Sequence, residues 1–201
     1  MKKLTFLAIF LLSTYLSISQ DQLTLAFSDS YAKEKSGKYA DAVTSLKAYY
    51  DEKSYEINLR LGWLTYLQGQ FSESLGYYNK AVELMPYAIE PRLGVALPAS
   101  ALGNWDMVIA QYNKILSIDP NNTLTLYRMG LISYEKKEYQ QAYKYFEKIV
   151  NLYPFDHDSL LMFAWANLKL GKTREAKILF NKTLLYNPDD ASAKEGLALI
   201  K

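Results

Sequence analysis

Apolar and small side chains recur at helical spacing along the stretch from Thr123 to Asp156. They fall on one face of each of two segments, which a short polar hinge at residues 136–138 separates. Pro154 follows the second segment, where a proline ends a helix. Each helix needs a partner to bury its apolar face, so the pattern predicts a helical hairpin. The first face holds Leu126, Met129, Gly130 and Ser133, and the second holds Tyr139, Ala142, Phe146 and Ile149.

The same pattern recurs along the chain with a period of 34 residues. Prolines mark the end of each period, and glycines mark the hinge, except at one hinge where Lys137 stands in the place of the glycine. Self-similarity at a fixed period of this length indicates stacked helical hairpins. The prolines are Pro86, Pro120, Pro154 and Pro188, and the glycines are Gly69, Gly103 and Gly171.

Five such hairpins are predicted, followed by a helix at 191–201 that we expect to cover the last hairpin, since terminal repeats need a partly polar cover. In the first hairpin we expect helices from Leu23 to about Gly37 and from Tyr39 to Tyr50. The third hairpin departs most from the pattern, because Ala96 replaces the small glycine. Polar side chains at the start of the later hairpins, such as Asp156, are expected to cap helices. The five hairpins span residues 23–54, 55–88, 89–122, 123–156 and 157–190.

These features resemble the tetratricopeptide repeat family. The resemblance implies an all-α fold, a right-handed superhelical α-solenoid of five helical hairpins plus a C-terminal capping helix. It also implies a protein that binds other proteins and is not an enzyme. In this family the first helices of successive repeats line a concave groove, where a ligand usually lies. Trp63, Tyr127 and Trp165 are the expected anchors, since large aromatic side chains dominate interface energetics.

Carried onto this sequence, the groove gives fourteen partner-binding positions, which we call the first-helix row. Two arginines in it could bind an acidic group or could face solvent, and the alternative for the whole row is packing between adjacent repeats. The family's carboxylate-binding groove uses asparagine and lysine at places held here by Tyr31, Trp63 and Leu97, so that specificity is not supported. The row consists of Phe27, Tyr31, Leu59, Arg60, Trp63, Tyr66, Leu93, Leu97, Tyr127, Arg128, Leu131, Tyr134, Leu161 and Trp165.

The first 19 residues are typical of a bacterial export signal. Lys2 and Lys3 precede an apolar run over residues 4–16, and Ser17 and Ser19 supply small residues before a cleavage site. The run is shorter than the roughly 20 residues of a membrane-spanning helix, although an uncleaved anchor is the alternative. The sequence contains no cysteine, so no lipid-modified cysteine can hold the chain to a membrane. We therefore expect a periplasmic or secreted protein with no stable membrane anchor after cleavage.

Charge and side-chain chemistry narrow the function further. Without Lys2 and Lys3, the chain has as many basic as acidic residues, so a nucleic-acid partner is not expected. The single histidine, His157, has no second histidine at helical spacing, and a lone histidine is usually structural. We expect no catalytic residue, no metal and no cofactor.

Two questions stay open at this stage. Pro98 falls inside the first helix of the third hairpin, removes a hydrogen bond to Gly94, and should bend or break that helix; this is either a functional kink or a tolerated irregularity. The predicted function is a scaffold or assembly factor of the bacterial envelope that binds a peptide or protein segment. The alternative is a carbohydrate-binding protein using the same aromatic groove. The sequence names neither the partner nor the oligomeric state.

Overall fold

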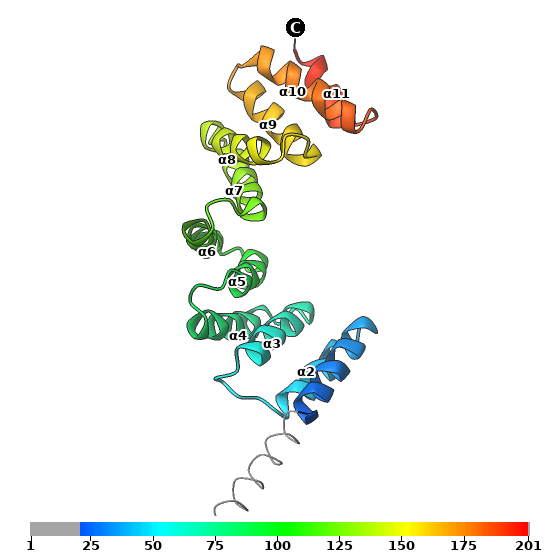
Figure 1. Ribbon diagram of the computed structural model, residues 1–201, viewed down its shortest axis with the longest axis vertical. Coiled ribbons are helices and arrows are strands. Elements are labelled where there is room, and N and C mark those ends of the chain that lie inside the picture. The colour runs from blue at the N-terminus through cyan, green and yellow to red at the C-terminus, as the bar shows by residue number, and fades with distance from the viewer. Residues whose placement is uncertain (1–20, 201) are drawn as a thin grey trace, which may run out of the picture. The chain divides into compact units, whose positions relative to one another are not determined.

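The computed structural model describes residues 21–200, and all regular structure in this range is helical. Helical residues 21–35 open it, and ten further helices follow (Figure 1). The predicted signal at 1–19 lies outside the described residues. The helices are α2 (Tyr39–Lys47), α3 (Tyr55–Leu67), α4 (Phe71–Leu84), α5 (Glu90–Ala101), α6 (Trp105–Ile118), α7 (Thr123–Glu135), α8 (Tyr139–Leu152), α9 (His157–Lys169), α10 (Thr173–Tyr186) and α11 (Ala191–Ala198).

The described part of the chain forms two compact units, one that ends at residue 111 and one that begins at residue 112. In the first unit, α2 packs on α3, α3 on α4, and α4 on α5. The core between the first layers is aliphatic and fully buried, which is the burial that amphipathic helices require. It includes Ala42, Leu46, Ile57, Leu61 and Leu64.

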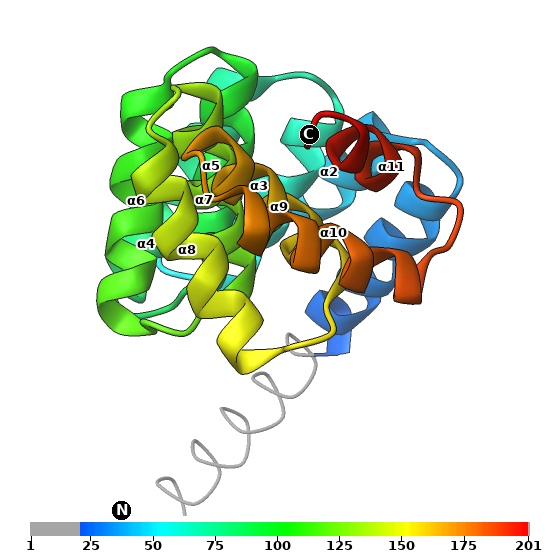
Figure 2. The same ribbon diagram turned by 90° about the horizontal axis from the view of Figure 1, so that it is seen from above.

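In the second unit, each helix from α7 to α11 packs against the next one along the chain (Figure 2). Phe146 of α8 fills the contact with α7, and Phe180 of α10 fills the contact that α10 makes with α9 and α11. Both rings are fully buried among small residues. Around Phe180 these small residues are Ala164, Ala176 and Ala193.

The hinge within each hairpin requires a left-handed backbone. Gly37, Gly69, Gly103 and Gly171 have φ values of 72–76° there, and Lys137 has φ 62°. The prediction that Lys137 occupies a glycine position is therefore confirmed. A lysine costs roughly 1–2 kcal/mol more than glycine in this conformation.

Polar side chains begin several of the helices. The carboxylate of Asp156 accepts the backbone N–H of Ser159 at 3.0 Å, and that of Asp190 accepts the N–H of Ala193 at 2.7 Å. The predicted capping role of Asp156 is confirmed. Each cap satisfies a backbone donor that the helix leaves free, which stabilises a helix by about 1 kcal/mol.

Two sequence expectations about helix ends are wrong. α2 ends at Lys47 rather than at Tyr50, because the Tyr49 N–H bonds back to the Leu46 carbonyl in a tighter turn. α5 runs through Pro98 to Ala101, so the expected break is wrong, while the expected bend stays a prediction. The proline stands close to the end of the helix, so it removes a single hydrogen bond near the terminus rather than in the middle.

Candidate functional site

The residues of the first-helix row divide between the two units. Those from Phe27 to Leu97 lie on the first helices of the first unit, and those from Tyr127 to Trp165 lie on α7 and α9 of the second. None carries a carboxylate, imidazole or thiol. The row therefore offers apolar and aromatic contact rather than acid–base chemistry.

In the first unit a polar cluster joins the first hairpin to α3. Trp63 Nε1 donates to Glu34 Oε1 at 2.7 Å, and Arg60 forms an ion pair with the other Glu34 oxygen. Arg60 Nε also donates to Ser30 Oγ at 3.2 Å, and the guanidinium lies 3.8 Å from the centre of the Tyr31 ring. We call these residues, Ser30, Tyr31, Glu34, Arg60 and Trp63, the first seam.

Arg60 is a structural residue of this seam. Its side chain is only 7% exposed, so it neither faces solvent nor stands free for an acidic ligand, which were the two roles weighed from sequence. Burial acts to raise the pKa of Glu34, but hydrogen bonds from Trp63 and Arg60 outweigh it, so the pKa lies below its ordinary value. The carboxylate thus stays charged and neutralises the guanidinium.

The aromatic members of the row in the first unit form a short stack. The rings of Trp63 and Tyr66 lie 5.8 Å apart and nearly parallel, and Tyr66 also contacts Phe71 at 5.7 Å. Trp63 and Tyr66 are half-buried, whereas Tyr31 is 56% exposed and Leu97 is also exposed. The row therefore combines fixed rings with freely accessible side chains.

The second unit holds its aromatic row residues in the same way. Tyr127 meets Phe146 edge-on at 5.8 Å, and Trp165 meets Phe180 edge-on at 5.2 Å. Trp165 Nε1 donates to Ser192 Oγ at 2.9 Å. Burial, followed by the charges of Tyr139 and Glu135, raises the pKa of Tyr134 to about 12. The contacts of Tyr127 with Phe146 and of Trp165 with Phe180 lie within single hairpins, whereas Trp63 bonds to the preceding hairpin and Trp165 bonds to α11. Packing between repeats, the alternative left open from sequence, therefore holds in part for Trp63 and Trp165.

The remaining row residues differ in exposure. Arg128 faces solvent on α7, as one of its two predicted alternatives stated. The aliphatic members are half-buried beside the aromatic ones. They are Leu59, Leu93, Leu131 and Leu161, with Phe27 in the same state.

Sequence reasoning missed a second group of exposed aromatic residues, which lie in the loops that lead from one hairpin to the next or, for Tyr186, at the last residue of α10. Tyr87 is 79% exposed, and Tyr153, Phe155 and Tyr186 are also exposed. Phe155 and Tyr186 contact each other at 5.4 Å. Their signal in the sequence was an aromatic residue directly beside a helix-ending proline, as at Pro86 and Pro154.

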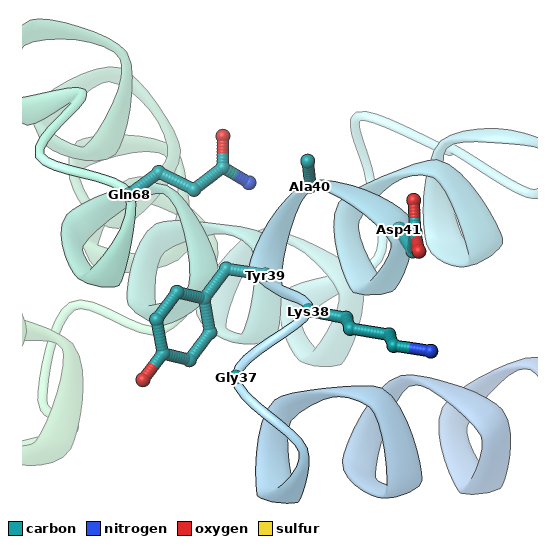
Figure 3. A pocket seen from close by; sticks show the side chains of 6 residues that line it. All are labelled: Gly37, Lys38, Tyr39, Ala40, Asp41 and Gln68. Atoms are coloured by element: carbon teal, nitrogen blue, oxygen red, sulfur yellow. The ribbon is translucent and has the colours of Figure 1, made fainter.

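A pocket of about 390 Å³ lies in the first unit beside the hinge of the first hairpin (Figure 3). Gln68 at the end of α3 extends toward the start of α2, and its Nε2 is buried without a hydrogen-bond partner. Its lining is Gly37, Lys38, Tyr39, Ala40, Asp41 and Gln68.

Within residues 21–200, no helix is long and apolar enough to cross a bilayer. The same part of the chain has no cluster of three or more histidine, cysteine, aspartate or glutamate residues suited to a metal ion.

Known proteins resemble this chain in sequence. Two family models described as tetratricopeptide repeat match residues 30–89 and 133–200. The TPR repeat-containing protein YpiA of Bacillus subtilis is 28% identical over 171 residues, which cover 82% of this chain and 40% of that protein. Anaphase-promoting complex subunit 6 of Arabidopsis thaliana is 24% identical over 136 residues, covering 65% of this chain and 25% of that protein. The chain therefore spans less than half the length of either relative.

Solved structures share the fold. A tetratricopeptide repeat protein from Parabacteroides merdae has a TM-score of 0.76 at 24% identity, covering 89% of this chain and 72% of that one. MamA from Desulfovibrio magneticus RS-1 has a TM-score of 0.70 at 16% identity, covering 85% and 98%. These similarities confirm the predicted fold class, an all-α solenoid of helical hairpins. Together, the matched residues and the shared fold show that the chain is built from tetratricopeptide repeats.

Proposed function

We propose that the chain is a non-enzymatic scaffold that binds a peptide or protein segment along its first-helix row. The observation that carries this proposal is the way the two row tryptophans are held. The indole N–H of Trp63 bonds to Glu34, and that of Trp165 bonds to Ser192, while both rings stay partly exposed. The rings are therefore fixed in orientation before a partner arrives.

Fixed aromatic rings favour binding for a physical reason. Ordering a side chain at an interface costs about 0.5–1.5 kcal/mol, and a ring that is already held avoids this cost. With their N–H groups used internally, the two indoles offer apolar ring surface and no donor. Sugars need many hydrogen-bond partners beside an aromatic ring, so this arrangement favours a peptide or protein over the carbohydrate alternative.

The comparisons support a role in an assembly. One relative is named as a subunit of the anaphase-promoting complex, which is a multiprotein complex by its name. Tetratricopeptide proteins are in general interaction scaffolds. For this chain we propose the bacterial envelope as the place of action, on the basis of the predicted signal at residues 1–19. Intact mass of the exported protein tests this, since a species that keeps these residues would mean an anchor.

The binding proposal is tested on a partner recovered by pull-down with the chain. Leu97→Ser and Tyr127→Ala should each weaken binding, and for a central anchor the loss is on the order of 2 kcal/mol, or more than tenfold in affinity. Lys144→Ala, on the exposed face of α8, is the matched control and should bind normally. Circular dichroism verifies that each variant is folded. Folded row variants with unchanged affinity would move the binding surface elsewhere, with the exposed loop aromatics as the next candidates.

A further inference from the structure

The single histidine of the chain lies between two carboxylates at the start of α9. His157 Nδ1 is 2.8 Å from Asp158 Oδ1, and His157 Nε2 is 3.0 Å from Asp190 Oδ2. The imidazole is largely shielded, with 19% of the side chain exposed, and the Asp190 side chain is 12% exposed. Its ring also contacts Tyr186 of α10 at 5.4 Å.

This geometry requires a particular protonation state. A neutral imidazole carries one N–H and one acceptor nitrogen, whereas a protonated imidazole donates from both nitrogens. A carboxylate oxygen can only accept, so a neutral ring would turn a lone pair toward one of the two carboxylates. The arrangement is therefore complementary to the imidazolium and not to the neutral ring.

Asp190 connects the histidine to the final helix. One of its oxygens accepts from His157, while the other accepts the backbone N–H of Ala193 and caps α11. α11 is only eight residues long, and isolated helices of that length are unstable in water. It depends on its contacts with α9 and α10 (Figure 2).

Those contacts are close and apolar. Ala193 is fully buried, and a Cβ placed on Gly196 would lie 2.2 Å from the Phe180 ring. Ser192 accepts the indole N–H of Trp165. Loosening α11 would therefore uncover the apolar flank of α10 around Phe180.

We propose that His157 is a pH-sensitive latch, whose protonation fastens α11 to the α9–α10 hairpin and whose deprotonation loosens it. The latch regulates how far the flank of the last hairpin is open to a partner. This latch does not rest on binding at the first-helix row, although Trp165 of that row donates its indole N–H to Ser192 of α11.

Several charged and titratable groups surround the latch. On α9 and its cap they are Asp156 and Asp158; from the start of α11 they are Asp190 and the exposed ion pair of Asp189 with Lys194. Tyr186 faces the ring from α10, and from α7 Tyr127 interacts electrostatically with both Asp156 and Asp158. Acidic groups outnumber the one nearby lysine, so the surroundings favour the charged imidazolium.

The hydrogen bond with Asp158 and then that with Asp190 outweigh burial and raise the pKa of His157 above its ordinary value of 6.5. Because the folded pKa is the higher one, the stabilisation is fully present below pH 6.5. It is lost as the pH rises through the folded pKa. The latch thus closes at pH values below the folded pKa of His157 and opens at pH values above it.

The test uses the full chain without a histidine tag, so that the one imidazole signal in NMR belongs to His157. We expect its titration midpoint above pH 6.5, together with a loss of hydrogen-exchange protection in α11, corrected for intrinsic exchange, across the same midpoint. Asp190→Asn keeps a good helix cap but removes the charge, so it should lower the midpoint and flatten this pH dependence. Asp189→Asn removes a neighbouring exposed carboxylate that does not contact the ring, so it should change both far less than Asp190→Asn.

Two outcomes would overturn the latch. One is a midpoint at or below 6.5 in the wild-type chain. The other is α11 protection that stays constant while His157 titrates, which would make the histidine a structural residue only. If Asp190→Asn loosens α11 at every pH, Asp158→Asn gives the decisive comparison, because Asp158 contacts the ring without capping α11.

Discussion

Two polar seams hold helices of this protein together, and they differ in the chemistry of their cation. The first seam, in the first unit, pairs Arg60 with Glu34; the last seam, in the second unit, pairs His157 with Asp190. Each includes a tryptophan at the same place in the repeat, Trp63 or Trp165, whose indole N–H bonds to a neighbouring helix. We define the last seam as His157, Asp158, Trp165, Asp190 and Ser192.

The difference shows how one repeat pattern gives seams with different responses. Arginine stays protonated at any physiological pH, so the first seam is fixed in charge on its cationic side. Histidine titrates near neutral pH, so the charge of the last seam depends on the pH of the solution. Within one fold, a contact between helices can therefore keep its cationic charge at all physiological pH values, while another contact changes its strength with pH.

The largest effect is expected from Glu34→Ala. It leaves the buried guanidinium of Arg60 without a counter-charge and the Trp63 N–H without its acceptor. Removing one partner of a buried ion pair costs about 3–5 kcal/mol, and the partial exposure of Glu34 places the expected loss near the lower end. The free energy of unfolding in urea measures it. Glu83→Ala, which breaks the exposed pair with Lys80, is the control. An equal loss of unfolding free energy in this variant would show that the first seam contributes no more than an exposed ion pair.

A smaller effect is expected from adding a methyl group at equivalent glycines. A Cβ at Gly94 would lie 2.3 Å from Tyr78, and one at Gly196 would lie 2.2 Å from Phe180. Gly94→Ala should destabilise by about 1–3 kcal/mol through overpacking. Gly196→Ala should act locally, since the short α11 can move away, and should lower hydrogen-exchange protection there. Gly76, whose Cβ would meet nothing within 4 Å, is the control; Gly76→Ala should stabilise by about 0.5–1 kcal/mol.

The two seams should also respond to pH in opposite directions. The folded pKa of Glu34 lies below its ordinary value of 4.5, so the stabilisation is present above pH 4.5 and is lost as the pH falls through the folded pKa. The last seam loosens instead as the pH rises. The free energy of unfolding should therefore fall less steeply toward acidic pH in Glu34→Gln than in the wild-type chain. In His157→Asn it should fall less steeply toward alkaline pH. A change on the same limb in both variants would contradict the comparison.

The smallest effect concerns the tryptophan acceptors. The bond from Trp165 to Ser192 joins neutral groups, so Ser192→Ala should cost about 1 kcal/mol. The bond from Trp63 to the Glu34 carboxylate is charge-assisted and should be worth about twice as much. Trp63→Phe and Trp165→Phe, compared by thermal unfolding, give the ranking. The reverse order would mean that the packing of the ring, rather than the charge of the hydrogen-bond acceptor, determines how much stability each tryptophan contributes.

Much of the fold could be predicted from the sequence, because the 34-residue repeat and the residues that end its helices can be recognised from local sequence alone. The hinge glycines and the helix-ending prolines separate the helices, and Lys137 was correctly placed at a hinge glycine position, where the structure has a left-handed backbone. The length of α2 and the unbroken α5 were missed. Both depend on how helix ends close their last turn, which periodicity does not report.

The candidate site was less predictable. Arg60 was expected either to bind a ligand or to face solvent, because a charged residue on a helix is usually exposed. Its carboxylate partner, Glu34, lies in the preceding repeat, and no local spacing links the two. The same reason hid the contact between His157 and Asp190, which stand 33 residues apart. The exposed loop aromatics, such as Tyr87, were missed since the repeat pattern directs attention to helix faces.

The most direct test of the binding role is a photo-crosslinking map of the chain with its partner. A photoreactive amino acid placed at Leu97, on the first-helix row, is compared with one at Lys144 on α8; both positions are exposed. Mass spectrometry of the products identifies the crosslinked position. We predict partner crosslinks at Leu97 and none at Lys144, whereas crosslinks at Lys144 alone would contradict binding along the first-helix row.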